Sequence, residues 1–103
     1  MLTHVRKRDV LLVRLEGELD QCSASGIRRD IDALLQDPSV RHLVLDMARM
    51  PFMDSSGIAV IIKLNQRMKS LGGRMWVENP AKQPLRVIDA SGIDRLVPVA
   101  ISK

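Results

Sequence analysis

Short apolar runs alternate along this chain with longer stretches whose apolar residues recur every three or four positions. This alternation constrains the fold more than any other feature, because the first pattern is typical of strands and the second of amphipathic helices. The first two runs are separated only by Lys7-Arg8-Asp9, which predicts a β-hairpin. Strand and helix patterns then alternate, so we expect an α/β fold: a mixed sheet opened by the hairpin, with helices packed against it.

Glycines and prolines set most of the expected boundaries. Pro38 ends the first helix after Asp37, and Gly72 and Gly73 supply left-handed residues that close the second helix. Pro98 lies in the last run, and we expect that strand at an edge because proline cannot donate to a ladder. In chain order we expect strands over 2–6 and 10–15 (ending at Gly17), a helix capped by Asp20 or Ser23 and built on Ile27, Ile31, Leu34 and Leu35, a strand over 42–47, a loop over 48–53, a helix over 55–71, a strand over 74–78, a helix over 84–90 and a strand over 96–101.

The composition is typical of a single globular domain. The chain has 103 residues, of which 46% are hydrophobic and 27% charged, and we expect one domain over 1–103. Only Phe52 and Trp76 are aromatic, so the core must be built from Leu, Ile, Val and Met. Cys22 stands alone, which excludes an internal disulfide, and neither it nor the two histidines suggests a metal site or cofactor.

Membrane and nucleic-acid roles are disfavoured. No apolar stretch approaches the ~20 residues that cross a bilayer, and no signal-peptide core follows the N-terminal charges, so we expect a cytoplasmic protein. The net charge of +4 raises nucleic acid as a partner. However, the basic residues are scattered along the chain and base-stacking aromatics are nearly absent, so we expect no direct nucleic-acid binding.

The segment from Asp54 to Gly57 begins the longest helical pattern. If Asp54 is the N-cap, its carboxylate accepts backbone hydrogen bonds from the first turn. Met53 then precedes the cap and Ile58 is the fourth helical residue, which is the hydrophobic-staple spacing. This register makes Ser55 the first helical residue, and we expect its hydroxyl to point away from the core.

Local chemistry leaves the role of this segment open. Asp-Ser-Ser-Gly is also an ordinary polar cap, whereas a nucleophilic serine is disfavoured because no Gly-x-Ser-x-Gly motif or triad is present. Gly57 costs roughly 1 kcal/mol relative to alanine in a helix, and close approach by another molecule is one reason to tolerate it. A phosphate on Ser55 would add about −1.5 to −2 charges at a helix N-terminus, where an anion is favoured, so it should not unfold the domain.

A resemblance to a known family extends this interpretation. The stretch MPFMDSSGIAVIIKLNQRMKSLGGRMWVENP resembles the core of the anti-sigma factor antagonists of the STAS domain family, of the sporulation type. The resemblance continues in LEGELD over 15–20, in RHLVLD over 41–46 and in DASGI over 89–93, in the expected order. It therefore covers nearly the whole chain, and the phrase FMDSSG is its most specific part.

The resemblance implies a partner switch rather than an enzyme. Such antagonists, when unphosphorylated, bind an anti-sigma factor that is also a serine kinase and so release a sigma factor. The kinase phosphorylates the serine after the aspartate, which is Ser55 here, and a metal-dependent phosphatase resets the protein. Asp20 matches the family's second functional carboxylate. The implied partner-binding residues are Asp20, Asp54, Ser55, Ser56 and Gly57.

Two departures and two alternatives accompany this resemblance. The chain is basic, whereas comparable members are acidic or near neutral. It also ends at Lys103, where the family commonly adds a C-terminal helix whose absence would expose apolar surface. The sporulation and general stress branches of these antagonists share the Asp-Ser-Ser-Gly motif, so the motif does not separate them. Alternatively, the chain is a STAS-domain subunit of a membrane lipid transporter and uses the same helix start for docking.

Overall fold

The computed structural model describes residues 1–102, which form one sheet with three α-helices. The sheet has the strand order β1-β2-β3-β4-β5, with β1 antiparallel to β2 and all other neighbours parallel. The predicted α/β class, with a mixed sheet opened by a hairpin, is confirmed. The elements are β1 (Leu2–Lys7), β2 (Val10–Leu19), α1 (Ala24–Leu34), β3 (His42–Met53), α2 (Ser55–Ser70), β4 (Arg74–Glu78), α3 (Lys82–Ser91), the 3₁₀ turn η1 (Ile93–Arg95) and β5 (Val99–Ala100).

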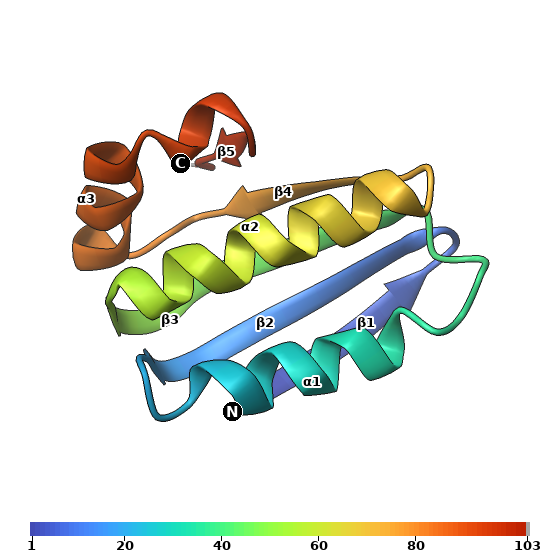
Figure 1. Ribbon diagram of the computed structural model, residues 1–103, viewed down its shortest axis with the longest axis horizontal. Helices are drawn as coiled ribbons and strands as arrows, with labels where there is room; N and C mark the ends of the chain where they lie inside the picture. The colour runs from blue at the N-terminus through green and yellow to red at the C-terminus, as the bar shows by residue number, and fades with distance from the viewer. Residues whose placement is uncertain (103) are drawn as a thin grey trace.

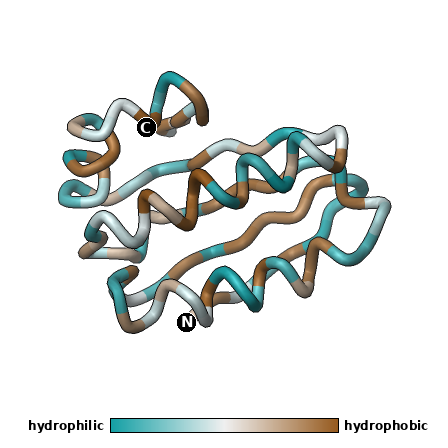
Figure 2. Tube along the Cα trace, in the orientation of Figure 1, coloured by the Kyte–Doolittle hydropathy of each residue, from teal (hydrophilic) through white to brown (hydrophobic). Residues whose placement is uncertain are grey.

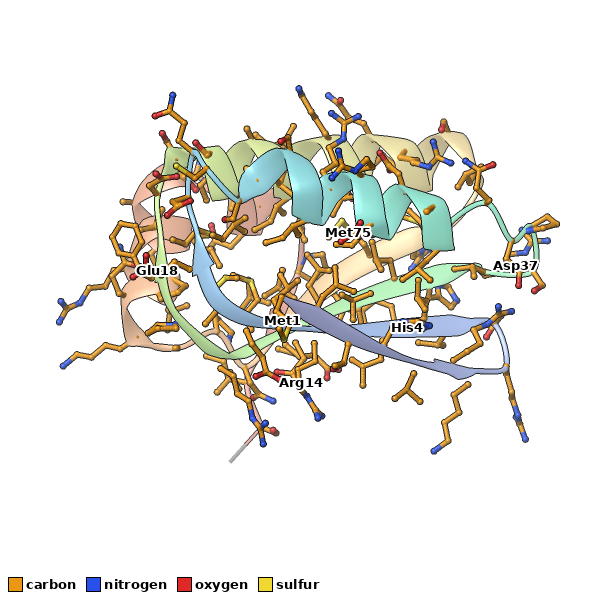
Figure 3. The ribbon with its side chains drawn as sticks, turned by 90° about the horizontal axis from the view of Figure 1, so that it is seen from below. Met1, His4, Arg14, Glu18, Asp37 and Met75 are labelled. Carbon is orange, nitrogen blue, oxygen red and sulfur yellow. The ribbon has the colours of Figure 1, made fainter. Side chains whose placement is uncertain are left out.

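The helices leave one face of the sheet open. Helices α1 and α2 lie side by side over the other face (Figures 1 and 3), and α3 lies near the carboxyl ends of β3 and β4 (Figure 1). Because β2 and β3 run in the same direction, the helices that follow them begin at the same end of the sheet. The starts of α1 and α2 and the whole of α3 therefore gather at one end of the molecule.

Within residues 1–102 the core lies between the sheet and the helices and is built of aliphatic residues and methionine. Hydrophobic residues run along the strands and alternate with polar ones along the helices (Figure 2). Its fully buried side chains include Met47, Met50 and Met53 of β3. The prediction of a core without aromatics is confirmed: Phe52 is 39% exposed, and Trp76 lies half-buried on the open face.

Strand β3 is longer than predicted, and the expected loop over 48–53 is wrong. These residues continue β3 and pair with β2, which itself passes Gly17 and ends at Leu19. The pairing shifts register twice, between Arg14 and Glu16 and again between Glu16 and Glu18. Strand β4 pairs with β3 only as far as Asp46, so Pro51 lies where β3 has one neighbour and no donor is needed on its other side.

Three other boundaries also differ from the expectation. Helix α1 ends at Leu34 rather than after Asp37, and α3 begins at Lys82, two residues before Pro84. Pro84 is tolerated there because the first four N–H groups of a helix have no intrahelical partner. Strand β5 spans only two residues, because the N–H groups of Leu96 and Val97 both donate to the Ile93 carbonyl oxygen and keep the start of the expected strand in a turn. Its predicted edge position is confirmed, since β5 pairs with β4 alone.

The two glycines after α2 have different functions. Gly72 alone is left-handed, with φ of +78°, so the prediction that both residues are left-handed is wrong for Gly73. A Cβ at Gly73 would overlap the carbonyl oxygen of Arg41 and come within 2.9 Å of Met68 Cε. The same Arg41 carbonyl accepts a hydrogen bond from the N–H of Arg74 at 3.0 Å. Gly73 is therefore required for the close approach of the two chain segments that precede β3 and β4.

This contact predicts opposite effects of alanine at two glycines. Gly73→Ala should lower the free energy of unfolding by about 1–3 kcal/mol, because the overlapped atom belongs to the backbone and cannot turn aside. Gly26→Ala is the control: the nearest atom to a Cβ there is Arg29 Nη2 at 3.8 Å, so the helix should gain about 0.5–1 kcal/mol. Urea unfolding measures both values. Equal effects of the two substitutions would contradict this assignment.

Candidate partner-binding site at the start of helix α2

Asp54 caps helix α2 as the sequence predicts. Its backbone is extended (φ −108°, ψ −168°), and its Oδ1 accepts a hydrogen bond from the N–H of Ser56 at 2.8 Å. Its own carbonyl oxygen accepts from the N–H of Gly57 at 3.0 Å. Met53 before the cap is fully buried, and Ile58 packs against the same core, as the staple spacing requires. The cap fixes Ser55 as the first residue of α2.

The two serines after the cap face different surroundings. Ser55 is exposed, whereas Ser56 is half-buried and its N–H is held by Asp54. Ser55 lines a hollow of about 460 Å³ between the start of α2 and α3, together with Arg86 and Val87. Ser56 lines a second hollow between α1 and α2, whose charged residues are Arg28, Arg29, Asp32 and Lys63. A group attached to Ser55 would therefore project toward α3, away from the α1–α2 hollow.

Gly57 does not provide clearance for a partner, and that prediction is wrong. The residue is buried, and a Cβ there would overlap Met53 Cγ, lie 2.6 Å from Met53 Sδ and 3.0 Å from Leu19 Cδ2. Both neighbours belong to the core. Gly57 is required because the first turn of α2 packs directly against the ends of β2 and β3. Its exclusion from the exposed surface leaves Asp54, Ser55 and Ser56 as the accessible part of the segment.

Asp20 lies next to this segment because β2 and β3 end together. Leu19 pairs with Met53, and the N–H of Asp54 donates to the Leu19 carbonyl oxygen at 3.2 Å. Asp20 and Asp54 are thus the first residues after two paired strand ends. This pairing places Asp20 beside the start of α2.

The carboxylate of Asp20 organises the turn before α1. Its Oδ1 accepts hydrogen bonds from the N–H groups of Cys22 at 2.9 Å and Ser23 at 3.0 Å. The bond from the Ser23 N–H is the main reason that the pKa of Asp20 lies below its ordinary value, so Asp20 is ionised at neutral pH. Ser23 occupies the N-cap position, but its hydroxyl bonds back to the Glu18 carbonyl at 2.8 Å rather than into the helix.

Gln83 is a residue of the site that sequence reasoning missed. Its side-chain Nε2 donates to the Met53 carbonyl oxygen at 3.0 Å, and its Oε1 accepts from the Met53 N–H at 2.8 Å. The amide therefore fastens the last residue of β3 to the first turn of α3. No spacing signal could have found it, because the two residues are 30 positions apart and glutamine is common on helix surfaces.

Among residues 1–102, the two hollows beside the serines are lined by helix residues. Neither hollow beside the serines is lined by a histidine. Within the same range, no group of three or more His, Cys, Asp or Glu side chains is placed to hold a metal ion. No helix of this part of the chain is long and apolar enough to cross a membrane. The geometry instead presents a hydroxyl and two carboxylates on an exposed end of the domain.

A family model, curated relatives and solved structures all relate this chain to the same family. A family model described as the STAS domain matches residues 2–102. The anti-sigma F factor antagonist of Paenibacillus polymyxa is 36% identical over 92 residues, which cover 89% of this chain and 79% of that protein. The anti-sigma-B factor antagonist of Bacillus subtilis strain 168 is 27% identical over 89 residues, covering 85% and 79%. The solved structure of the unphosphorylated anti-sigma factor antagonist SpoIIAA shares the fold, with a TM-score of 0.85 at 24% identity over 100% of this chain and 89% of that one.

The packing of Gly57 predicts a coupling with Met53. Gly57→Ala should lower the free energy of unfolding by about 1–3 kcal/mol, because overpacking outweighs the gain of up to roughly 1 kcal/mol in helix propensity. In a Met53→Ala background the same substitution should cost less than half as much, since the overlapping atoms are gone. A double-mutant cycle by urea unfolding measures this coupling. An equal cost in both backgrounds would mean that Met53 is not the reason for the glycine.

Proposed function

Because this chain belongs to the STAS domain family, we propose that it is an anti-sigma factor antagonist whose partner binding is switched by a phosphate on Ser55. The observation that carries the proposal is the exposed hydroxyl of Ser55 at the first position of α2, directly after a capping aspartate. The proposed partner-binding surface consists of Asp20, Asp54, Ser55 and Ser56. Gly57 lies buried beneath this surface and supports it.

The geometry favours Ser55 over Ser56 as the phosphate acceptor. A kinase needs the acceptor hydroxyl to reach its own active site, and Ser55 is the exposed member of the pair. The N–H of Ser56 is hydrogen-bonded to Asp54, so moving that residue outward would break the cap. A lost N-cap costs about 0.5–2 kcal/mol, whereas Ser55 is reached without that cost.

The phosphate is expected to act on the surface rather than on the fold. Backbone N–H groups and the helix dipole favour an anion at the start of α2, and Arg86 lines the same hollow as Ser55. The added charge of about −1.5 to −2 also lies beside the carboxylates of Asp54 and Asp20. A partner that accommodates two carboxylates then meets a larger and more negative group, and it dissociates while the domain stays folded.

The proposed cycle needs two enzymes that act on this chain, and the chain itself catalyses nothing. An anti-sigma factor with serine kinase activity binds the unphosphorylated form and phosphorylates it, and a metal-dependent serine phosphatase removes the phosphate. The cycle runs in the cytoplasm. The 36% identity to an anti-sigma F factor antagonist, against 27% to an anti-sigma-B factor antagonist, favours the sporulation-type branch.

Phosphosite mapping tests the acceptor. The cognate anti-sigma factor and ATP should add one phosphate to the wild-type chain and to Ser56→Ala, and none to Ser55→Ala. Intact-mass and fragment mass spectrometry locate the group, and the Paenibacillus polymyxa antagonist with its own anti-sigma factor serves as a positive control. Phosphate confined to Ser56, or labelling of Ser55→Ala at the wild-type rate, would refute the role of Ser55.

A pair of matched aspartate variants tests how the switch works. Ser55→Asp should weaken binding to the anti-sigma factor by roughly tenfold or more, about 1.4 kcal/mol, while the melting temperature stays within about 2 °C of wild type. Ser56→Asp adds the same charge one residue away, facing the α1–α2 hollow and its basic residues rather than α3, and should weaken binding less than Ser55→Asp does. Calorimetry measures both quantities. Loss of folding in Ser55→Asp would place the effect inside the domain, contrary to the proposal.

A further inference from the structure

The open face of the sheet carries a row of apolar side chains that no described helix covers. Val5, Leu12, Val44 and Trp76 are aligned across four strands by the pairing register. Val5 is 60% exposed, Leu12 and Trp76 are half-buried, and Val44 between them is only 3% exposed. These four residues line one concave surface of about 800 Å³. We call them the apolar row.

Charged side chains of opposite sign flank the apolar row. Toward the amino ends of the parallel strands, the next row holds Lys7 and Arg74 and is basic. Toward their carboxyl ends, the next row holds Arg14, Asp46 and Glu78 and is acidic in sum. Figure 3 shows Arg14 on the side of the sheet away from α1 and α2.

Arg74 and Glu78, at the β4 ends of the two flanking rows, are available for ion pairs with another molecule. Arg14 is already paired with Asp46 at 3.1 Å. Glu78 accepts a hydrogen bond from Trp76 Nε1 at 3.1 Å, which holds its carboxylate beside the apolar row. Arg74 is exposed, and within residues 1–102 neither Arg74 nor Glu78 forms an ion pair. One unpaired cation and one unpaired anion thus lie two residues to either side of Trp76 on β4.

We propose that this face binds the same face of a second copy, about a two-fold axis that runs along the apolar row. Such an axis reverses the strand direction, so the basic row of one copy lies against the acidic row of the other. On β4, Arg74 of one copy then faces Glu78 of the second copy, and the reciprocal pair forms by symmetry. A two-fold axis parallel to the strands is disfavoured, because it would place the basic row of one copy against the basic row of the other.

The contacts that would stabilise this dimer are those of two β-sheets packed face to face. Stacked sheets lie about 10 Å apart, a spacing at which the side chains of the two apolar rows meet. The apolar row supplies the water-excluding centre and the flanking charges supply the polar rim and the register. Ser55 stands at the start of α2, on the other side of the sheet, so both copies keep the proposed switch accessible.

Sedimentation of the 103-residue chain over a roughly hundredfold concentration range tests self-association. The weight-average mass should rise from the monomer toward twice that value. Arg74→Glu and Glu78→Arg should each weaken the dimer by roughly tenfold or more, because each variant alone places like charges opposite each other twice. Arg29→Glu makes the same charge change on α1, outside the open face, and should leave the dimer unchanged. Thermal melts verify that each variant is folded.

Mixing the two charge variants gives the decisive result. In an equimolar mixture, the glutamate introduced at position 74 of the first variant meets the arginine introduced at position 78 of the second. The unchanged Arg74 of the second variant meets the unchanged Glu78 of the first, so the mixture should dimerise about as strongly as wild type and more strongly than either variant alone. A structural defect in either variant would not be repaired by mixing. A wild-type chain that stays monomeric over the whole range, or a mixture that stays monomeric while wild type dimerises, would overturn the proposal.

Discussion

Asp54 donates its backbone N–H to the carbonyl oxygen of Leu19 at 3.2 Å, and this bond closes the parallel pairing of β2 and β3. Residues of the candidate site follow directly from these two strand ends: Asp20 follows Leu19, and Ser55 and Ser56 follow Asp54. Because both helices follow these strand ends, their unpaired N–H groups and the carboxylates of Asp20 and Asp54 lie at one end of the domain. The position of the exposed serine is therefore a consequence of strand register.

The packing beneath the site explains why a glycine stands in the first turn of α2. Met53 and Leu19 are fully buried and lie against Gly57, so the first turn of α2 rests on the strand ends without a side chain between them. Gln83 holds the backbone of Met53 from the other side. The hydroxyl of Ser55 thus stands on a rigid support, and a phosphate placed on it changes the outer surface more readily than it changes the helix.

Local rules predicted the parts of this structure that depend on local chemistry. The register of Ser55 follows from a cap and a staple spacing within six residues, and the structure confirms both Asp54 as cap and Ser55 as first helical residue. The extension of β3 through Pro51 could not be predicted, because proline argues against a strand that has neighbours on both sides. Pro51 is tolerated because β4 pairs with β3 only as far as Asp46, which no local pattern reveals. The burial of Gly57 could not be predicted, because it depends on contacts with Met53 and Leu19. Contacts between the ends of two strands are not encoded in a local sequence pattern. The link from Gln83 to Met53 is of the same kind.

In the proposed switch, a phosphate on Ser55 alters the binding surface and leaves the fold intact. Amide hydrogen exchange on the chain with and without phosphoserine at position 55 tests this most directly, because it reports the stability of each helical turn separately. We predict altered exchange only at the start of α2 and in the turn that follows Asp20, with unchanged or greater protection from Val60 to Met68. A loss of protection along the whole of α2 would contradict the account, since the phosphate would then act by unfolding the helix.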